Sequence, residues 1–356
     1  MSDMSEILDK AVRGGRLCLE EGVALLASPD LLLTGRAADL VHRRMHPGGR
    51  VTFIIDRNIN YTNVCLCRCR FCAFYREEGD PDAYLIREED LFQKIDETIA
   101  AGGTAVMLQG GLHPQLGLEY YLELLRSIKK RYAIHIHSFS PPEVAYMARK
   151  SGLSTCDTLL KLQEAGLDSL PGGGAEILDN RVRNRISPDK ISWEEWMAVM
   201  DAAHRIGMKT TATMMFGHVE TLEERVLHLV RVREQQDRTG GFTAFIPWTF
   251  QPGNTRLGGA ASTGVDYLKT LAVSRLMLDN VPNIQASWVT QGAKMAQVAL
   301  SFGANDFGST MLEENVVRAA GVNYRVPMDE IVQCIKEAGF TPAQRNTGYE
   351  VLREFA

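Results

Sequence analysis

The sequence lacks several features that mark whole classes of protein. It has no excess of basic residues, since its formal net charge is −5, and this argues against binding to a nucleic-acid backbone. The longest uncharged stretch, residues 98–118, is broken by paired glycines, so no membrane span is predicted. Charged side chains among the first twenty residues argue against a secretory signal peptide. We therefore expect a cytoplasmic protein without a nucleic-acid or membrane partner.

The chain also lacks Gly/Ser-rich linkers and internal repeats, which favours one continuous domain. Eight apolar or β-branched runs alternate with helical patterns. These runs are residues 51–55, 104–108, 133–137, 167–170, 208–216, 242–248, 284–289 and 304–307. Such an order predicts an α/β fold, a closed (β/α)8 TIM-type barrel, although a doubly wound open sheet would show the same alternation. We expect an N-terminal helical cap at 1–48, the barrel at 49–326, and a C-terminal helical extension packed on it at 327–356.

Four of the seven cysteines fall within residues 65–72. Cys65, Cys69 and Cys72 are spaced C-x3-C-x2-C, and Cys67 lies between them. A 4Fe-4S cluster is usually held by four thiolates, so a loop that offers three leaves one iron open to another ligand. In a TIM-type barrel the loops that follow the strands carry the active site. The cysteine loop follows the first predicted strand, which places a predicted cluster at the mouth of the barrel.

Clustered cysteines also occur in disulfide frameworks, in structural zinc sites and in electron-carrying clusters without further chemistry. Disulfides need an oxidising compartment, and structural zinc needs a second ligand pair, which no downstream C-x2-C or H-x3-H supplies. The electron-carrier interpretation remains open, but it leaves an eight-unit barrel without a purpose.

The loop resembles the cluster-binding signature of radical S-adenosylmethionine (SAM) enzymes, in which an aromatic residue such as Phe71 often precedes the last cysteine. The resemblance extends over most of the chain. It is carried by residues 60–65, 71–76 (which include Phe74), 110–114, 171–176, 211–218 and 304–308. Together these segments resemble the cyclic dehypoxanthine futalosine synthases of the futalosine pathway to menaquinone. Aminofutalosine synthase and the enzymes that make the deazaflavin chromophore share much of the pattern and remain alternatives.

The resemblance implies roles for residues outside the cysteine loop. Gly110 and Gly111 would contact the methionine part of SAM, Glu176 its ribose, and Arg183 or Arg185 its carboxylate. Ser138 is a further candidate for contacting a hydroxylated ligand. Only Cys65, Cys69 and Cys72 reproduce the family spacing, so we assign the cluster to these three and treat Cys67 as a bystander.

The resemblance also implies the chemistry. An electron from an external donor such as flavodoxin or ferredoxin would reach the cluster and release a 5′-deoxyadenosyl radical from SAM. That radical would take the 4′ hydrogen of the dehypoxanthine futalosine ribose, and the ribose radical would add to the benzoate ring. Loss of an electron and a proton would complete the spirocyclic product. The candidates for the proton acceptor are His113, His137, His218 and Asp306.

Overall fold

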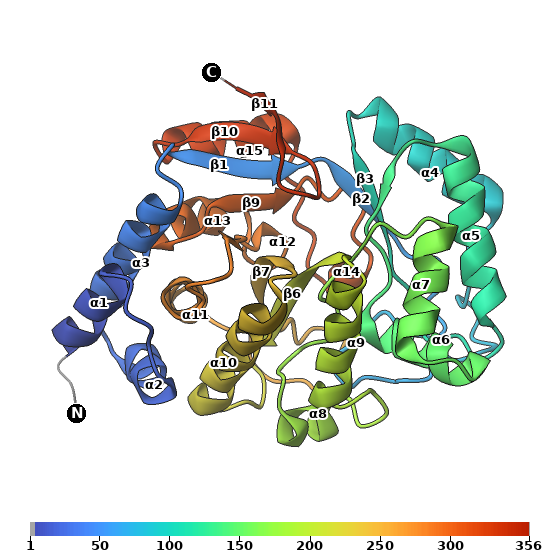
Figure 1. Ribbon diagram of the computed structural model, residues 1–356, viewed down its shortest axis with the longest axis horizontal. Helices are drawn as coiled ribbons and strands as arrows, with labels where there is room; N and C mark the ends of the chain where they lie inside the picture. The colour runs from blue at the N-terminus through green and yellow to red at the C-terminus, as the bar shows by residue number, and fades with distance from the viewer. Residues whose placement is uncertain (1–3, 356) are drawn as a thin grey trace.

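The computed structural model describes residues 4–355, and parallel strands form a barrel at its centre (Figure 1). The strands are β1 (Arg50–Ile54) continued by β2 (Asp56–Ile59), β3 (Ala105–Leu108), β4 (His135–Ile136), β5 (Ser169–Leu170), β6 (Lys209–Phe216), β7 (Phe242–Thr249), β8 (Asn283–Ile284) and β9 (Asp306–Ser309). They match the eight predicted runs, but β8 is shorter than expected because the helix α12 (Trp288–Gln291) begins soon after it.

Hydrogen bonds close the ring of strands. β9 pairs in parallel with β1, in the register Thr52 to Asp306. Where the regular ladder pauses, single bonds continue it: Ser138 N–H donates to Ser169 O at 3.0 Å between β4 and β5. Likewise Ala286 N–H donates to Asp306 O at 2.8 Å between β8 and β9. The predicted TIM-type barrel is confirmed, and the open-sheet alternative is wrong.

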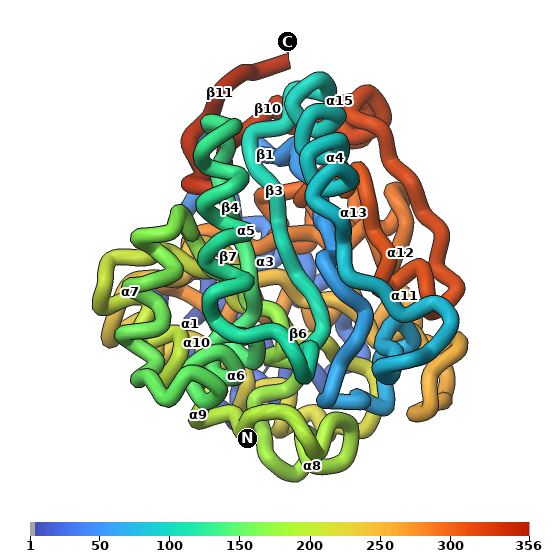
Figure 2. Tube along the Cα trace, turned by 90° about the vertical axis from the view of Figure 1, so that its right-hand side faces the viewer, coloured from blue at the N-terminus to red at the C-terminus, as the bar shows by residue number. Residues whose placement is uncertain are grey.

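Helices cover the outside of the barrel, and several begin where the sequence provides a cap. Ser192 and Glu195 form a capping box at the start of α9, as Thr221 and Glu224 do for α10. The outer helices are α4 (Glu88–Ala100), α5 (Leu118–Arg131), α6 (Pro141–Ser151), α7 (Thr155–Ala165), α8 (Asn180–Ile186), α9 (Trp193–Arg205), α10 (Leu222–Thr239), α11 (Gly264–Met277), α13 (Ala293–Ala299) and α14 (Val316–Ala319). Figure 2 shows the side of the molecule covered by α4 to α7. Within residues 4–355, no helix combines the length and apolar character that a bilayer crossing needs.

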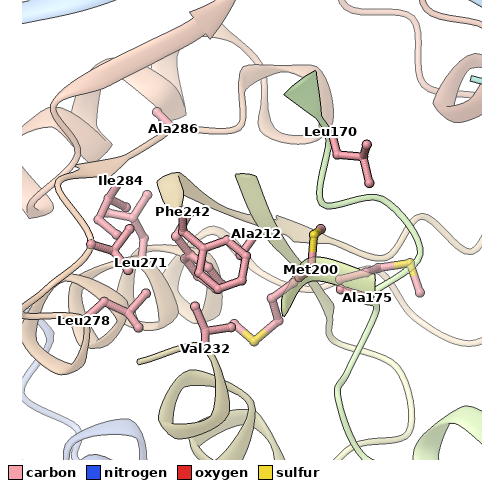
Figure 3. Packing of buried hydrophobic residues seen from close by; sticks show 14 of the residues in the cluster. Leu170, Ala175, Met200, Ala212, Val232, Phe242, Leu271, Leu278, Ile284 and Ala286 are labelled. Atoms are coloured by element: carbon pink, nitrogen blue, oxygen red, sulfur yellow. The ribbon is translucent and has the colours of Figure 1, made fainter. Parts of the chain in front are cut away.

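The core lies between the strands and these helices. Figure 3 shows Phe242 of β7 beside Ala212 of β6, with Met200 of α9 and Val232 of α10 in the same cluster. Each of these side chains is at most 2% exposed. Burying a side chain of this size contributes about 1.5–3 kcal/mol. The strand periodicity therefore holds the barrel by placing apolar side chains against the helices.

The N-terminal segment is helical, as predicted, although residues 1–3 of the expected cap lie outside the described part. It comprises α1 (Met4–Val12), α2 (Leu19–Ala27) and α3 (Leu31–Met45), which cover α10 and α11 at the left of Figure 1. The guanidinium of Arg16, between α1 and α2, pairs with Asp237 at 2.6 Å and with Asp279 at 2.9 Å. These contacts join the cap to the barrel helices.

The C-terminal segment corrects the prediction of a purely helical extension. Only α15 (Met328–Glu337) is helical, and it is followed by β10 (Thr341–Arg345) and β11 (Val351–Glu354). β10 pairs in parallel with the first half of β1, while the continuation β2 pairs with β3. The short run from Thr341 to Arg345, with a proline at its second position, forms a strand because β1 supplies its hydrogen-bonding partners. As a result the chain end enters the barrel wall.

Candidate active site

A cavity of about 390 Å³ lies where the barrel strands end. Alternate residues of the strands reach it, because successive side chains of a strand point to opposite faces. The polar and aromatic members of this inner face include Asp56, Asn58, Asn60, Thr211, Thr213 and Trp248. The carboxyl ends of TIM-barrel strands are where active sites form. The cavity therefore occupies the position expected of an active site.

The loop after β2 brings all four clustered cysteines to this cavity. Backbone hydrogen bonds hold the loop at its base: Cys65 N–H donates to Arg76 O at 3.1 Å, and Arg76 N–H donates to Asn63 O at 2.7 Å. Among residues 4–355 every cysteine is a free thiol. The prediction that this loop lies at the barrel mouth is confirmed.

The thiols have the chemistry that an iron–sulfur cluster requires. The hydrogen bond from Cys67 lowers the pKa of Cys65 to about 6, and the thiol of Cys67 likewise lowers the pKa of Cys69. Burial raises the pKa of Cys72 to about 11. The thiolate is the form that binds metal, so Cys67 shifts Cys65 and Cys69 toward the metal-binding form, whereas burial shifts Cys72 away from it.

The arrangement of the thiols also differs from a site for one metal ion. In the described residues, no three His, Cys, Asp or Glu side chains converge on a single ion position. Cluster ligands bind separate irons and need not converge on one point. Cys65, Cys69 and Cys72 all line one cavity, as ligands of a single cluster would, and the sulfur of Cys67 lies 3.6 Å from Asp189 O.

The glycine turn after β3 packs directly against the cysteine loop. A Cβ on Gly111 would overlap Val64 O and come within 2.7 Å of the Cβ of Cys65. Leu66 N–H donates to Leu112 O at 3.1 Å, and Leu112 N–H donates to the Cys65 sulfur at 3.4 Å. Gly110 and Gly111 both line the cavity. Glycine is thus required here because the two loops approach closely.

Gly111→Ala is expected to reduce iron incorporation by about tenfold, because overpacking costs about 1–3 kcal/mol and 1.4 kcal/mol corresponds to a factor of ten. The measurement is iron and acid-labile sulfide per chain after anaerobic reconstitution. Gly117→Ala is the matched control, since a Cβ on Gly117 meets nothing within 4 Å. Equal iron content in the two variants would contradict this account of the turn.

Glu143 fixes the start of α6 beneath the glycine turn. Its carboxylate accepts hydrogen bonds from the Tyr61 hydroxyl at 2.6 Å, from Gly110 N–H at 3.1 Å, and from both N–H and Oγ of Ser140. Burial raises its pKa to about 7. Ser138, which we predicted to contact a ligand, lies outside the cavity and accepts from Leu108 N–H at 2.8 Å. That prediction is corrected: Ser138 ties β3 to β4.

Glu176 lines the cavity as expected and has a partner that the sequence analysis missed. Lys190 Nζ lies 2.8 Å from Glu176 Oε1 and 5.1 Å from the centre of the Phe71 ring. Burial opposes the charge, but Cys69 and Glu176 hold the pKa of Lys190 above its usual value. Phe71 and Phe74 also line the cavity. A buried cation thus lies beside the thiols and would offset negative charge there.

The two predicted carboxylate-binding arginines are not in the cavity. Arg183 is 1% exposed and donates to Gly174 O, Ala175 O and Ile191 O at 2.6–3.1 Å. It supports the glycine-rich turn after β5 from behind. Arg185, on the opposite face of the short helix α8, is exposed. Helix periodicity therefore turns one side chain inward to the backbone and the other to solvent, and neither lines the cavity.

Of the four candidate proton acceptors, only His137 lines the cavity. Burial lowers its pKa to about 3, so the imidazole is neutral near pH 7. His137 Nδ1 and His135 Nε2 both contact the hydroxyl of Ser169, at 2.6 and 2.7 Å, which confirms that they face the same side of the strand. The imidazole is therefore an unprotonated but weakly basic group on the cavity wall.

The other two histidines lie outside the cavity. His113 Nδ1 accepts from Gln115 N–H at 3.2 Å. His218 is buried within the turn before α10, where its ring nitrogens contact Val219 N–H at 2.7 Å and Met215 O at 3.0 Å. Both predictions are corrected, because each ring hydrogen-bonds to the backbone of the turn in which it lies.

Asp306 is fully engaged as an acceptor, and its prediction as a base is also corrected. It accepts from Arg345 Nε at 2.5 Å and Nη2 at 3.0 Å, from Thr52 Oγ1 at 2.5 Å, and from Gly308 N–H at 2.9 Å. Its role is to place Arg345, which lines the cavity from the end of β10. Arg345 and Tyr349, whose ring lies 3.9 Å from the guanidinium, are site residues that the sequence analysis missed.

A loop with three thiols in C-x3-C-x2-C spacing at the mouth of a TIM-type barrel is the arrangement of one class, the radical SAM enzymes. Residues 59–231 match the model of the radical SAM superfamily. The fold is also similar to methylornithine synthase (PylB), with a TM-score of 0.73 at 22% identity over 95% of this chain and 97% of that one. The maturase HydG of Carboxydothermus hydrogenoformans gives a TM-score of 0.78 at 16% identity over 97% of this chain and 80% of that one.

Sequence similarity over nearly the whole chain identifies the family within this class. Residues 239–355 match the model described as the CofH/MqnC C-terminal region. The chain is 51% identical to a cyclic dehypoxanthine futalosine synthase of Halalkalibacterium halodurans, over 98% of this chain and 95% of that protein. It is 45% identical to a 5-amino-6-(D-ribitylamino)uracil–L-tyrosine 4-hydroxyphenyl transferase of Methanopyrus kandleri, over 99% and 98%. The chain belongs to the CofH/MqnC family of radical SAM enzymes, and this membership implies a 4Fe-4S cluster and SAM.

Proposed function

We propose that this enzyme converts dehypoxanthine futalosine to cyclic dehypoxanthine futalosine. The observation that carries the proposal is the 51% identity to a synthase of that name over nearly the whole of both chains. A second such synthase, from Streptomyces coelicolor, is 46% identical over 99% of this chain and 89% of that protein. Both matches include the cysteine loop, the barrel and the C-terminal strands.

The residues of the cavity support distinct parts of this reaction. When bound, the cluster and SAM supply a carbon radical able to remove a hydrogen atom from the substrate. Cys65, Cys69 and Cys72 would hold the cluster, and Gly110, Gly111 and Glu176 would border SAM. Phe71, Phe74 and Trp248 are apolar neighbours that would exclude water from a reactive radical.

The cyclised ring regains aromaticity by giving up an electron and a proton, and the cluster, oxidised when SAM is cleaved, would be able to take the electron back. We assign His137 as proton acceptor because, of the four candidates, it is the one that lines the cavity, where Ser169 holds its ring; burial makes it a weak base, so the proton transfer relies on its position. The cavity would hold the ribose and the benzoate ring at near-attack distance, which is a large contribution to rate.

The proposal is tested by incubating the anaerobically reconstituted enzyme with SAM, dithionite and dehypoxanthine futalosine. We expect methionine, 5′-deoxyadenosine and a product lighter than the substrate by two hydrogens. Deoxyadenosine without this product would overturn the cyclase assignment and leave the radical SAM class intact. A parallel reaction with tyrosine and 5-amino-6-(D-ribitylamino)uracil tests the second candidate, the transferase activity named for relatives at 42–45% identity.

A further inference from the structure

Two side chains of β2, Asp56 and Asn58, and that of Asn60 just after it form a polar row along one wall of the cavity. Asp56, Asn58 and Asn60 point inward at alternate positions. Each faces a residue of β9 or of the segment that follows it: the Ser309 hydroxyl at the end of β9 donates to Asp56, Asn58 Nδ2 lies 3.5 Å from Glu314 Oε2, and Asn315 Nδ2 donates to Asn60 Oδ1 at 3.1 Å. This row runs toward the cysteine loop, because the chain continues from Asn60 to Cys65.

The row has unused hydrogen-bond acceptors. Asn58 is 3% exposed, and its Oδ1 has no hydrogen-bond partner among residues 4–355. The Ser309 bond to Asp56 goes to Oδ1, so Oδ2 is bound by no donor among residues 4–355; unlike Asn58 Oδ1, it belongs to a side chain that is partly exposed. Buried polar atoms are nearly always paired, so an unpaired acceptor that lines a cavity points to a ligand donor.

Three of the five N–H groups of the neighbouring Arg345 are already engaged. Arg345 donates to Asp306 through Nε and Nη2 and to Asn346 O through Nη1 at 3.1 Å. Glu143, the other buried carboxylate on this cavity, accepts four hydrogen bonds and has no such vacancy. The β2 wall therefore presents acceptors, and it suits a ligand group that brings several donors.

We propose that Asp56 and Asn58 bind neighbouring hydroxyl groups of the substrate's sugar, an inference that rests on the proposed function. Hydroxyls donate to carboxylate and amide oxygens, and bonds to an ionised carboxylate are about twice as strong as neutral ones. Burial raises the pKa of Asp56 to about 6, which still leaves it mostly ionised near pH 7. This polarity orients the sugar along β2, near the cysteine loop.

The test measures binding without turnover. The reconstituted enzyme with SAM, but without reductant, is titrated with dehypoxanthine futalosine and with its 2′-deoxyribose and 3′-deoxyribose analogues. Asp56→Asn and Asn58→Leu are each expected to weaken binding of the full substrate by about tenfold. Each variant and the native enzyme are expected to bind at least one of the deoxy analogues with nearly equal affinity. That analogue lacks the hydroxyl that would donate to the substituted residue, so removing the acceptor costs it nothing. Asp96→Asn, an exposed carboxylate on α4, is the control and should change nothing.

Unchanged affinity in both variants, or an equal loss for the substrate and both analogues, would overturn the proposed subsite. Iron content and circular dichroism confirm that each variant is folded. Failure of the native enzyme to convert dehypoxanthine futalosine would instead overturn the proposed function. The subsite is then decided by the same variants titrated with 5-amino-6-(D-ribitylamino)uracil, whose ribityl chain also carries neighbouring hydroxyls.

Discussion

Replacing Cys65, Cys69 or Cys72 by alanine is expected to abolish cluster binding and reduce deoxyadenosine formation to background. Each of these thiols lines the cavity, and each would bind a different iron. Loss of even an outer partner of a metal ligand lowers affinity about 10–100-fold, so loss of a ligand is expected to exceed this. The measurements are iron and sulfide content, the electron paramagnetic resonance signal of the reduced protein, and deoxyadenosine yield.

Cys67→Ala is the informative control, because its thiol is buried beside the same cavity but does not fit the family spacing. We expect it to keep most of the cluster and to lose only the hydrogen bonds that favour Cys65 and Cys69 as thiolates. Cys156→Ala, exposed on α7, controls for the loss of any cysteine. A Cys67→Ala variant without cluster, together with a Cys65→Ala variant that retains it, would show that the ligand register is wrong.

Local sequence patterns predicted most of the barrel because its strands and helices carry their own periodic patterns of apolar residues. The runs at 208–216 and 242–248 are β-branched or aromatic and correspond closely to β6 and β7. The strand β10 has no such pattern, with a proline and three polar residues in five positions. Its pairing with β1 depends on residues at the other end of the chain. Contacts of that range leave no periodic signal in a single sequence.

The site was predictable where one short segment carries the chemistry. The cysteine loop and the Gly110-Gly111 turn needed only spacing and their place after a strand. Predictions for single polar residues were less successful, because position at a strand end does not reveal what the side chain contacts. Asp306 forms an ion pair with Arg345, and Arg183 donates its hydrogen bonds to backbone carbonyls. Lys190, in a loop without a motif, reaches the thiols only through the fold.

One signal for the missed wall was present in the sequence. Asp56, Asn58 and Asn60 alternate directly after the apolar run at 51–55 and before the cysteine loop. Three polar residues with a period of two, continuing a strand in a barrel, would face the lumen. Their partners Ser309, at the end of β9, and Glu314, in the segment after it, could not have been inferred, since both lie about 250 residues further along the chain.

Arg345→Met is expected to destabilise the protein by about 3–5 kcal/mol, because removing one partner of a buried ion pair leaves the other charge unpaired. Arg345 is 4% exposed, its partner Asp306 is fully buried, and the pair joins β10 to β9 beside β1. The charge of Asp306 holds the pKa of Arg345 above its usual value, against the effect of burial. The measurement is the shift of the first urea unfolding transition.

Two further variants separate the ion pair from packing. Removing both charges in Arg345→Met with Asp306→Leu is expected to recover much of the loss, because apolar replacements of a buried pair are often neutral. Arg126→Ala breaks a surface pair with Glu119 of similar length, 2.8 Å, but with both side chains more than half exposed. Exposed pairs contribute about 0–1 kcal/mol, so this control should shift the transition little. An equal shift for Arg345→Met and Arg126→Ala would show that the C-terminal strand is not held by its buried charge. A large shift with recovery in the double variant would show that the Arg345–Asp306 ion pair holds β10 against β1 and β9. The same pair then keeps that side of the cavity closed.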